Sequence, residues 1–208
     1  VFGKWAKPNY NSAVATFCYN ICRDQPITIN DTNAKLKLVY IDDVIKEFVS
    51  LLTNTSKNAS FYYEVSPVYE TTVGFVADTL NQFKQSRTNS TIGAVGCGLV
   101  RALYSTYVSY LPTELFSYSL VKHEDPRGVF VEMLKTETSG QFSFFTAHPR
   151  ITRGGHYHHT KTEKFLVIKG KARFKFKHIL TGECYELFTD GATPEVVETV
   201  PGWNHDIT

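Results

Sequence analysis

Four side chains able to bind a divalent metal ion gather in the last fifty or so residues of the chain. Two come from an H-x-H pattern, one is a nearby glutamate and one ends a P-G-x-x-H pattern: His156, His158, Glu163 and His205. In a strand, residues two apart share a face, so we expect His156 and His158 to point the same way. Three imidazole nitrogens and one carboxylate oxygen suit zinc, nickel, iron or manganese, with zinc as our first expectation.

Each of these residues also has an ordinary structural explanation when it is taken alone. A single histidine is usually a surface or satisfied core residue, and Glu163 would serve equally well at a solvated strand end. The joint spacing is much more specific, because H-x-H, a glutamate, Gly170 and P-G-x-x-H follow in one order. This arrangement resembles both signature motifs of the cupin superfamily. The resemblance implies a jelly-roll β-barrel that surrounds a metal ion.

A second resemblance concerns the substrate. Four segments resemble, in the same order, those of dTDP-4-dehydrorhamnose 3,5-epimerases: 125–132, Gln141, 151–157 and 200–205. In that family the histidine of the R-G-x-H motif removes a proton beside the sugar ketone. The resemblance therefore implies that His156 is the base. The implied substrate contacts are Arg127, Glu132 and Gln141, with Arg153 beside the histidine as a further candidate.

The two resemblances disagree about His156. Rhamnose epimerases lack the second histidine of H-x-H and work without a metal, whereas a metal-bound imidazole has no free lone pair for a proton. Ligand and base therefore stay open as roles for His156. Inverting a carbon beside a ketone also needs a proton donor and a positive group to stabilise the enolate oxygen. Lys161, Tyr157 and Asp206 are available as proton carriers, and Lys161 joins His156 as a candidate catalytic residue.

The second half of the chain reads as a succession of short β-strands. Alternating or β-rich runs predict strands at 116–121, 128–134, 142–147, 165–168, 172–176, 185–188 and 196–200. Many short strands separated by turn residues are typical of an all-β sandwich or barrel. We therefore predict an all-β cupin domain over residues 113–208, which would hold the metal ligands.

The first part of the chain mixes helix and strand patterns. Apolar spacing predicts helices at 11–23, 44–52 and 72–83, strands at 36–41 and 61–65, and a polar loop at 85–97. The segments Val1-Phe2-Gly3-Lys4 and Leu36 to Val44 resemble the C-terminal part of extended short-chain reductases that act on nucleotide sugars. We therefore predict an α+β chain in which residues 1–112 are the truncated C-terminal part of a Rossmann-type reductase plus a linker.

Together, the two parts resemble the bifunctional capsular polysaccharide assembling enzymes that make the UDP-N-acetyl-L-fucosamine precursor. The resemblance implies that the cupin domain epimerises C3 of a UDP-2-acetamido-2,6-dideoxy-hexos-4-ulose before the reductase domain reduces C4 with NADPH. This sequence has neither a Gly-rich dinucleotide turn nor a Tyr-x-x-x-Lys dyad, so we expect a fragment, with NADPH used only by the full-length enzyme. The alternatives are a non-catalytic sugar-binding or dimerisation cupin, or a metal-dependent cupin oxygenase.

The composition limits the kinds of partner that the protein is expected to bind. The formal net charge of +2 and the absence of a long Lys/Arg cluster argue against nucleic acid, and no apolar run is long enough for a membrane helix. Four scattered cysteines are typical of reduced thiols in the cytoplasm. We therefore expect a cytoplasmic protein with a UDP-sugar substrate. Because cupins often pair through their sheets, we also expect a homodimer.

Overall fold

The computed structural model describes residues 1–53 and 62–208 and divides into two compact units. The first unit holds residues 1–120 and 132–142, and the second holds residues 121–131 and 143–208. Two of the three divisions fall inside strands, β4 and β5, whose bounds are given below. Each unit is described by itself.

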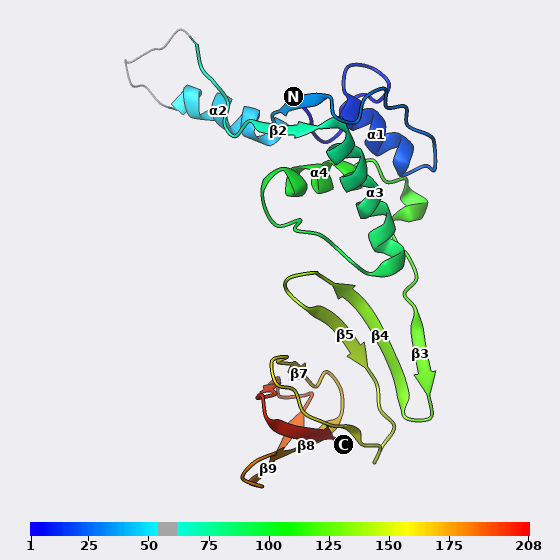
Figure 1. The fold of residues 1–208 in the computed structure, drawn as a ribbon, viewed down its shortest axis with the longest axis vertical. Helices are drawn as coiled ribbons and strands as arrows, with labels where there is room; N and C mark the ends of the chain where they lie inside the picture. The colour runs from blue at the N-terminus through cyan, green and yellow to red at the C-terminus, as the bar shows by residue number, and fades with distance from the viewer. Residues whose placement is uncertain (54–61) are drawn as a thin grey trace. The chain divides into compact units, whose positions relative to one another are not determined.

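All the helices that the described residues form lie in the first unit (Figure 1). They are α1 (Ala13–Ile21), α2 (Ile41–Thr53), α3 (Val73–Asn89), α4 (Gly98–Val108) and a short 3-10 helix at Thr113–Leu115. Two of them begin at hydroxyl caps, because Ser12 accepts a hydrogen bond from the Ala15 amide and Thr72 accepts one from the Phe75 amide. α1, α3 and α4 bury a common apolar core that includes Phe17, Leu80, Leu103 and Tyr107.

The strands of the first unit differ from the sequence prediction. β1 (Lys35–Leu38) pairs antiparallel with β2 (Tyr69–Thr72). Of the strand predicted at 61–65, residue 61 lies outside the described residues and residues 62–65 are not in a strand. α3 also continues through the start of the predicted loop to Asn89, because its first turns are anchored in the core by Val76 and Leu80. The described residues thus show a mixed helix and strand unit without a parallel Rossmann sheet.

Strands dominate the rest of the chain (Figure 1). They are β3 (Lys122–Asp125), β4 (Gly128–Lys135), β5 (Gln141–Phe145), β6 (Arg153–His156), β7 (Lys164–Leu166), β8 (Lys171–His178), β9 (Cys184–Asp190), β10 (Val196–Glu198) and β11 (Trp203–Ile207). Their orders are β3-β4-β5, β6-β11-β8-β9 and β10-β7. Phe174, Phe176, Val197 and Ile207 form the buried core of the second unit, because alternate residues of these strands face inward.

The observed strands match most of the predicted runs but not all of them. The run at 116–121 is not a strand, and pairing begins at Lys122 instead. β6 and β11 lie where no run was predicted, although they carry the motif histidines. Within the described residues the hydrogen-bonded strands form open sheets, so a jelly-roll barrel remains an interpretation of this fold. None of the helices at 1–53 and 62–208 has the length and apolar content that crossing a bilayer requires.

Candidate metal centre

Two of the predicted ligands face each other across a pair of neighbouring strands. His156 at the end of β6 is the register partner of His205 in β11, and their ring centroids lie 4.7 Å apart. Gly154 makes this approach possible. Its φ is +110°, and a Cβ atom there would lie 2.4 Å from the carbonyl oxygen of His205. A register shift between His205 and Asp206 accompanies this close contact.

His158 reaches the same place by another route than the one predicted. β6 ends at His156, so His158 lies in the following loop and a shared strand face does not position it. The loop is held because the Gly202 amide donates a hydrogen bond of 2.9 Å to the carbonyl oxygen of His158. The rings of His156 and His158 are 4.9 Å apart between centroids. The two rings therefore come close together through a loop rather than through a shared strand face.

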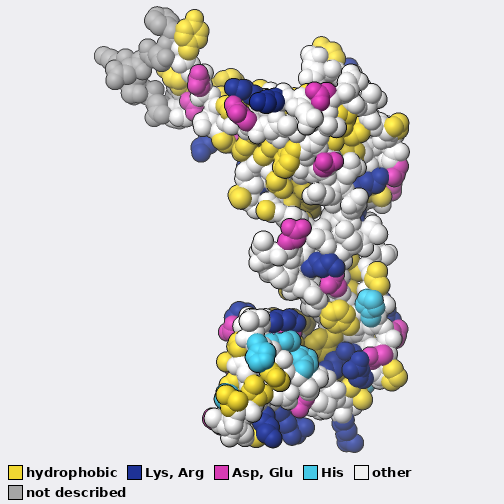
Figure 2. Space-filling model, in the orientation of Figure 1, with side chains coloured by type: hydrophobic (Ala, Val, Ile, Leu, Met, Phe, Trp, Pro, Cys, Tyr) yellow, Lys and Arg dark blue, Asp and Glu magenta, His cyan; other side chains and the backbone are white. Residues whose placement is uncertain are grey.

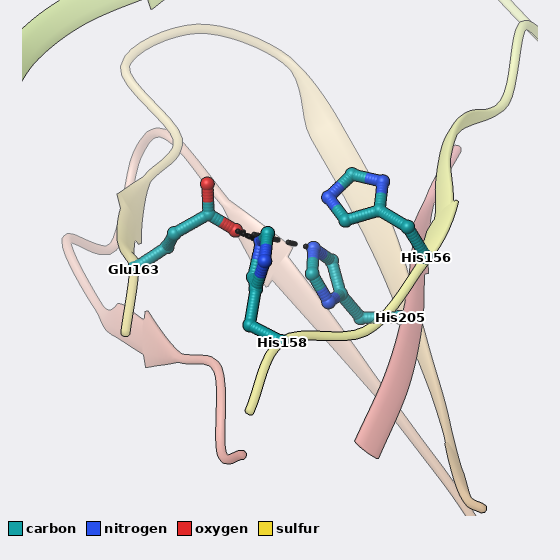
Figure 3. A group of neighbouring side chains, drawn as sticks. All are labelled: His156, His158, Glu163 and His205. Carbon is teal, nitrogen blue, oxygen red and sulfur yellow. Dashed lines mark hydrogen bonds and ion pairs between the residues drawn. The ribbon is translucent and has the colours of Figure 1, made fainter. Parts of the chain in front are cut away.

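Glu163 completes the group from the loop before β7 (Figure 3). Its Oε2 atom lies 3.2 Å from His158 Nε2 and 3.4 Å from His205 Nε2. One ligand atom from each of the four residues lies within 4.8 Å of all the others. Histidine side chains of the second unit gather at its surface (Figure 2), and His156 is the exposed member of the group.

These separations agree with the size of a metal site. With metal–ligand distances of about 2.0–2.1 Å, the ligand atoms of a tetrahedral site lie about 3.3 Å apart. The distances from Glu163 Oε2 to the two Nε2 atoms, 3.2 and 3.4 Å, bracket this value. Three nitrogens and one oxygen form a donor set that zinc and other first-row ions accept. The residues present therefore fit a divalent metal ion.

The protonation state of the group also suits a cation. Burial lowers the pKa of His205, which is only 2% exposed, and the neighbouring His156 lowers this pKa further. Burial by itself raises the pKa of Glu163. The hydrogen bond and charge of Lys161, with smaller contributions from the histidines, more than offset this and bring that pKa below its usual value. A neutral imidazole and an ionised carboxylate are the forms that metal binding requires.

The other predicted site residues have different surroundings. Lys161 Nζ lies 2.7 Å from Glu163 Oε1, so this candidate proton carrier is ion-paired with a predicted metal ligand. The exposed Arg127 pairs with Asp125 in the turn between β3 and β4. In the first unit, Glu132 pairs with Lys135, and Gln141 is exposed at the start of β5.

Arg153 is the predicted substrate contact whose surroundings most need a ligand. Its guanidinium carbon lies 5.2 Å from the centroid of the Phe145 ring. Its Nε and Nη2 atoms are buried and have no hydrogen-bond partner within the part of the chain that the structure describes. These two atoms form the side-on fork with which arginine binds carboxylates and phosphates. An oxyanion would satisfy both donors at once.

One supporting residue, Thr199, was not predicted from the sequence. The Glu163 amide donates a 2.8 Å hydrogen bond to Thr199 Oγ1, and the Thr199 amide donates a 2.8 Å bond to the Glu163 carbonyl oxygen. Thr199 is 3% exposed. A threonine two residues before Pro201 carries no motif of its own, so spacing alone does not mark it.

Comparisons with known proteins agree with the motifs. Residues 123–208 match the family model described as the Polysaccharide biosynthesis C-terminal domain. The chain is 62% identical over all 208 residues to the UDP-2-acetamido-2,6-beta-L-arabino-hexul-4-ose reductase of Pseudomonas aeruginosa strain PA103, of which it covers 56%. This chain therefore spans little more than half the length of that relative.

Solved structures of CapF are also similar to this chain. The capsular polysaccharide assembling protein CapF from Staphylococcus aureus matches with a TM-score of 0.91 and 44% identity over 99% of this chain and 56% of CapF. CapF with the inhibitor 3-isopropenyl-tropolone matches with the same TM-score and identity, and 60% of that chain is covered. The resemblance inferred from the motifs is thus confirmed: the chain is similar over its whole length to the P. aeruginosa reductase and over 99% of its length to the capsular polysaccharide assembling protein CapF, and its residues 123–208 match the polysaccharide biosynthesis C-terminal domain.

Proposed function

We propose that this chain is the C3 epimerase part of an enzyme that remodels a nucleotide sugar for capsular polysaccharide synthesis. The substrate would be a UDP-2-acetamido-2,6-dideoxy-hexos-4-ulose, bound by a cupin domain over residues 113–208. The observation that carries the proposal is the convergence of four ligand atoms from His156, His158, Glu163 and His205. The P. aeruginosa relative supports the substrate class, because its name contains a UDP-linked hexul-4-ose.

A divalent ion, with zinc as first choice, would be held by these four residues. When bound, such an ion stabilises negative charge on the oxygen of a ketone as the neighbouring carbon loses its proton. The CapF inhibitor supports this assignment, because a tropolone carries a ketone and a hydroxyl oxygen on adjacent carbons and chelates metal ions through both. The Glu163 side chain is 22% exposed and that of His205 is 2% exposed, so these two ligands are largely shielded from solvent.

Lys161 and His156 are the proposed proton carriers, and His156 in that role would leave the ion to His158, Glu163 and His205. His156 is the exposed imidazole of the group and Lys161 carries a protonated amine 2.7 Å from Glu163, so both are within reach of an entering sugar. One nitrogen cannot both bind an ion and accept a proton, and His156→Ala separates the two roles. If the variant keeps its metal but no longer exchanges the C3 proton of the sugar with solvent, His156 is the base. If the variant loses its metal, His156 is a ligand.

The diphosphate of the substrate would bind the unpaired fork of Arg153. Two buried donors without partners favour a bidentate oxyanion, and a nucleotide sugar supplies one in its diphosphate. Arg127, Glu132 and Gln141 remain proposed contacts with the rest of the substrate. Arg127 would have to exchange Asp125 for a substrate group, which its exposed position permits.

The remaining assignments concern the whole enzyme. We propose that NADPH reduces C4 in a full-length enzyme and that these 208 residues supply the epimerisation. We propose a cytoplasmic location, because all four cysteines are free thiols and the cytoplasm keeps thiols reduced. The proposed homodimer is supported by the exposed apolar side chains of Leu166 and Val196, which are cross-strand partners in the β10-β7 sheet. Sedimentation of the purified chain measures its oligomeric state directly.

Solvent deuterium exchange tests the proposed reaction. The metal-loaded chain is incubated in heavy water with the UDP-linked 4-keto sugar, and loss of the C3 proton signal is followed by NMR. We expect exchange with the natural sequence and none with Glu163→Gln. Glu198→Gln is the matched control, because Glu198 pairs with Lys164 on the protein surface and touches none of the four ligands. Folded, metal-loaded protein that leaves the C3 proton unexchanged would contradict the proposal, and oxygen uptake would indicate an oxygenase.

A further inference from the structure

The two carboxylate oxygens of Glu163 have separate partners. Oε2 lies 3.2 Å from His158 Nε2 and 3.4 Å from His205 Nε2. Oε1 lies 2.7 Å from Lys161 Nζ, on the other side of the carboxylate. The group therefore presents one oxygen to the imidazoles, and its second oxygen is already engaged by a cation.

The main chain of Glu163 is fixed independently of that ion pair. Reciprocal hydrogen bonds of 2.8 Å join its amide and carbonyl to the buried Thr199. With the backbone held, rotation of the carboxylate about its own bonds is the movement that would bring Oε1 towards the imidazoles. The contact with Lys161 opposes that rotation, because turning the carboxylate would break a charge-assisted hydrogen bond.

We propose that Lys161 is a positioning residue that restricts Glu163 to ligation through one oxygen and so sets which metal ion the site prefers. The inference rests on the metal site proposed above and deepens it. Zinc accepts four ligands in a tetrahedron, whereas manganese prefers more oxygen ligands in an octahedral arrangement. A glutamate that offers one oxygen beside three imidazoles suits zinc. A glutamate that is free to offer two oxygens favours manganese.

A purely electrostatic role for Lys161 makes a different prediction. A positive charge near the site repels every divalent cation to a similar extent, so its removal would raise the affinities for zinc and manganese together. Loss of positioning changes the ratio of the two affinities instead. The ratio therefore separates positioning by Lys161 from simple charge repulsion.

The test compares metal binding by the purified 208-residue chain and its variants. Affinities for Zn²⁺ and Mn²⁺ are measured by competition with a chromophoric chelator, and Co²⁺-loaded samples are examined in the visible range, where tetrahedral sites absorb strongly. In Lys161→Met we expect the zinc-to-manganese affinity ratio to fall about tenfold or more, which is the usual effect of replacing a residue that holds a metal ligand in place. We also expect the visible absorption bands of the Co²⁺-loaded variant to be weaker. Lys161→Arg should restore both readouts.

Lys164→Met is the matched control, because Lys164 has the same charge and pairs with Glu198 rather than with Glu163. Lys161→Gln is a second test variant that keeps a polar end without the charge. An unchanged affinity ratio and cobalt spectrum in the folded Lys161 variants would overturn the positioning role while leaving the metal site intact. A natural chain that binds no stoichiometric Co²⁺ would instead remove the metal site, and the proposed function with it.

Discussion

Gly154→Ala probes the close approach of β6 and β11 that brings His156 and His205 together. An added Cβ would lie 2.4 Å from the carbonyl oxygen of His205, whereas ordinary contact begins at 3.4 Å. The two strands would have to separate by about 1 Å, because a close-packed interior cannot absorb the overlap. Alanine would also adopt a φ of +110°, which side-chain-bearing residues rarely do. The backbone strain costs about 1–3 kcal/mol and overpacking a similar amount, so we expect the free energy of unfolding to fall by about 2–6 kcal/mol.

The same displacement should weaken the metal site. Metal–ligand distances tolerate changes of about 0.2 Å, so moving one strand by about 1 Å removes His156 or His205 from the ligand set. We expect zinc affinity to fall about a hundredfold or more, above the outer-shell range. Urea unfolding of the metal-free protein and a zinc titration measure the two effects separately.

Gly182→Ala is the matched control for this prediction. Gly182 also has a positive φ, +73°, but an added Cβ there meets nothing within 4 Å. We expect it to lose about 1–2 kcal/mol of stability from the backbone alone and to keep the natural zinc affinity. If Gly154→Ala bound zinc as tightly as the natural chain, the close strand approach would not be what assembles the ligands.

Three further predictions follow from the same contacts. Arg153→Lys keeps the charge but loses the fork, so we expect KM for the UDP-sugar in the deuterium-exchange assay to rise about tenfold or more, since a hydrogen bond to a charged group contributes about 1.5–3 kcal/mol; an unchanged KM would remove Arg153 from the diphosphate site. Burial lowers the pKa of His205 in the folded state, so the stability that neutral His205 contributes is present above the unfolded pKa of about 6.5 and is lost as the pH falls through the folded pKa. The metal-free protein should therefore melt at a lower temperature at about pH 5 than at about pH 7.5. His205→Gln should reduce that difference in melting temperature. Burial also raises the pKa of the Cys18 and Cys22 thiols, so a thiol reagent should modify only Cys97 and Cys184 in the native protein and all four cysteines after unfolding; rapid modification of four thiols in the folded protein would contradict the packing of α1.

Strands with apolar alternation were predictable from the sequence, and strands built from motif residues were not. β8 falls on a predicted run in which Phe174 and Phe176, two residues apart, are buried in the core. β6 has the sequence R-G-G-H, which shows no period of two, and β11 has W-N-H-D-I, in which only Trp203 and Ile207 are apolar. Their pairing depends on the close contact at Gly154, which is a property of two distant segments rather than of either one.

The candidate site was likewise predictable in part from the sequence. Its four metal-binding side chains were chosen from their types and spacing, and the structure brings them together. The path of the chain was predicted less well, because His158 lies beyond the end of its strand and is positioned by a bond to Gly202. The support from Thr199 and the unpaired donors of Arg153 depend on tertiary contacts that no local pattern encodes.

The metal content of the purified chain tests the central claim most directly. Elemental analysis should find one zinc or similar ion per chain in the natural sequence and in His159→Ala, whose side chain contacts the Tyr157 ring rather than the ligand group. His158→Ala should retain far less than one ion per chain while remaining folded. Equal metal content in the natural chain and the folded His158→Ala variant would contradict the account, because His158 would then not be one of the residues that bind the ion.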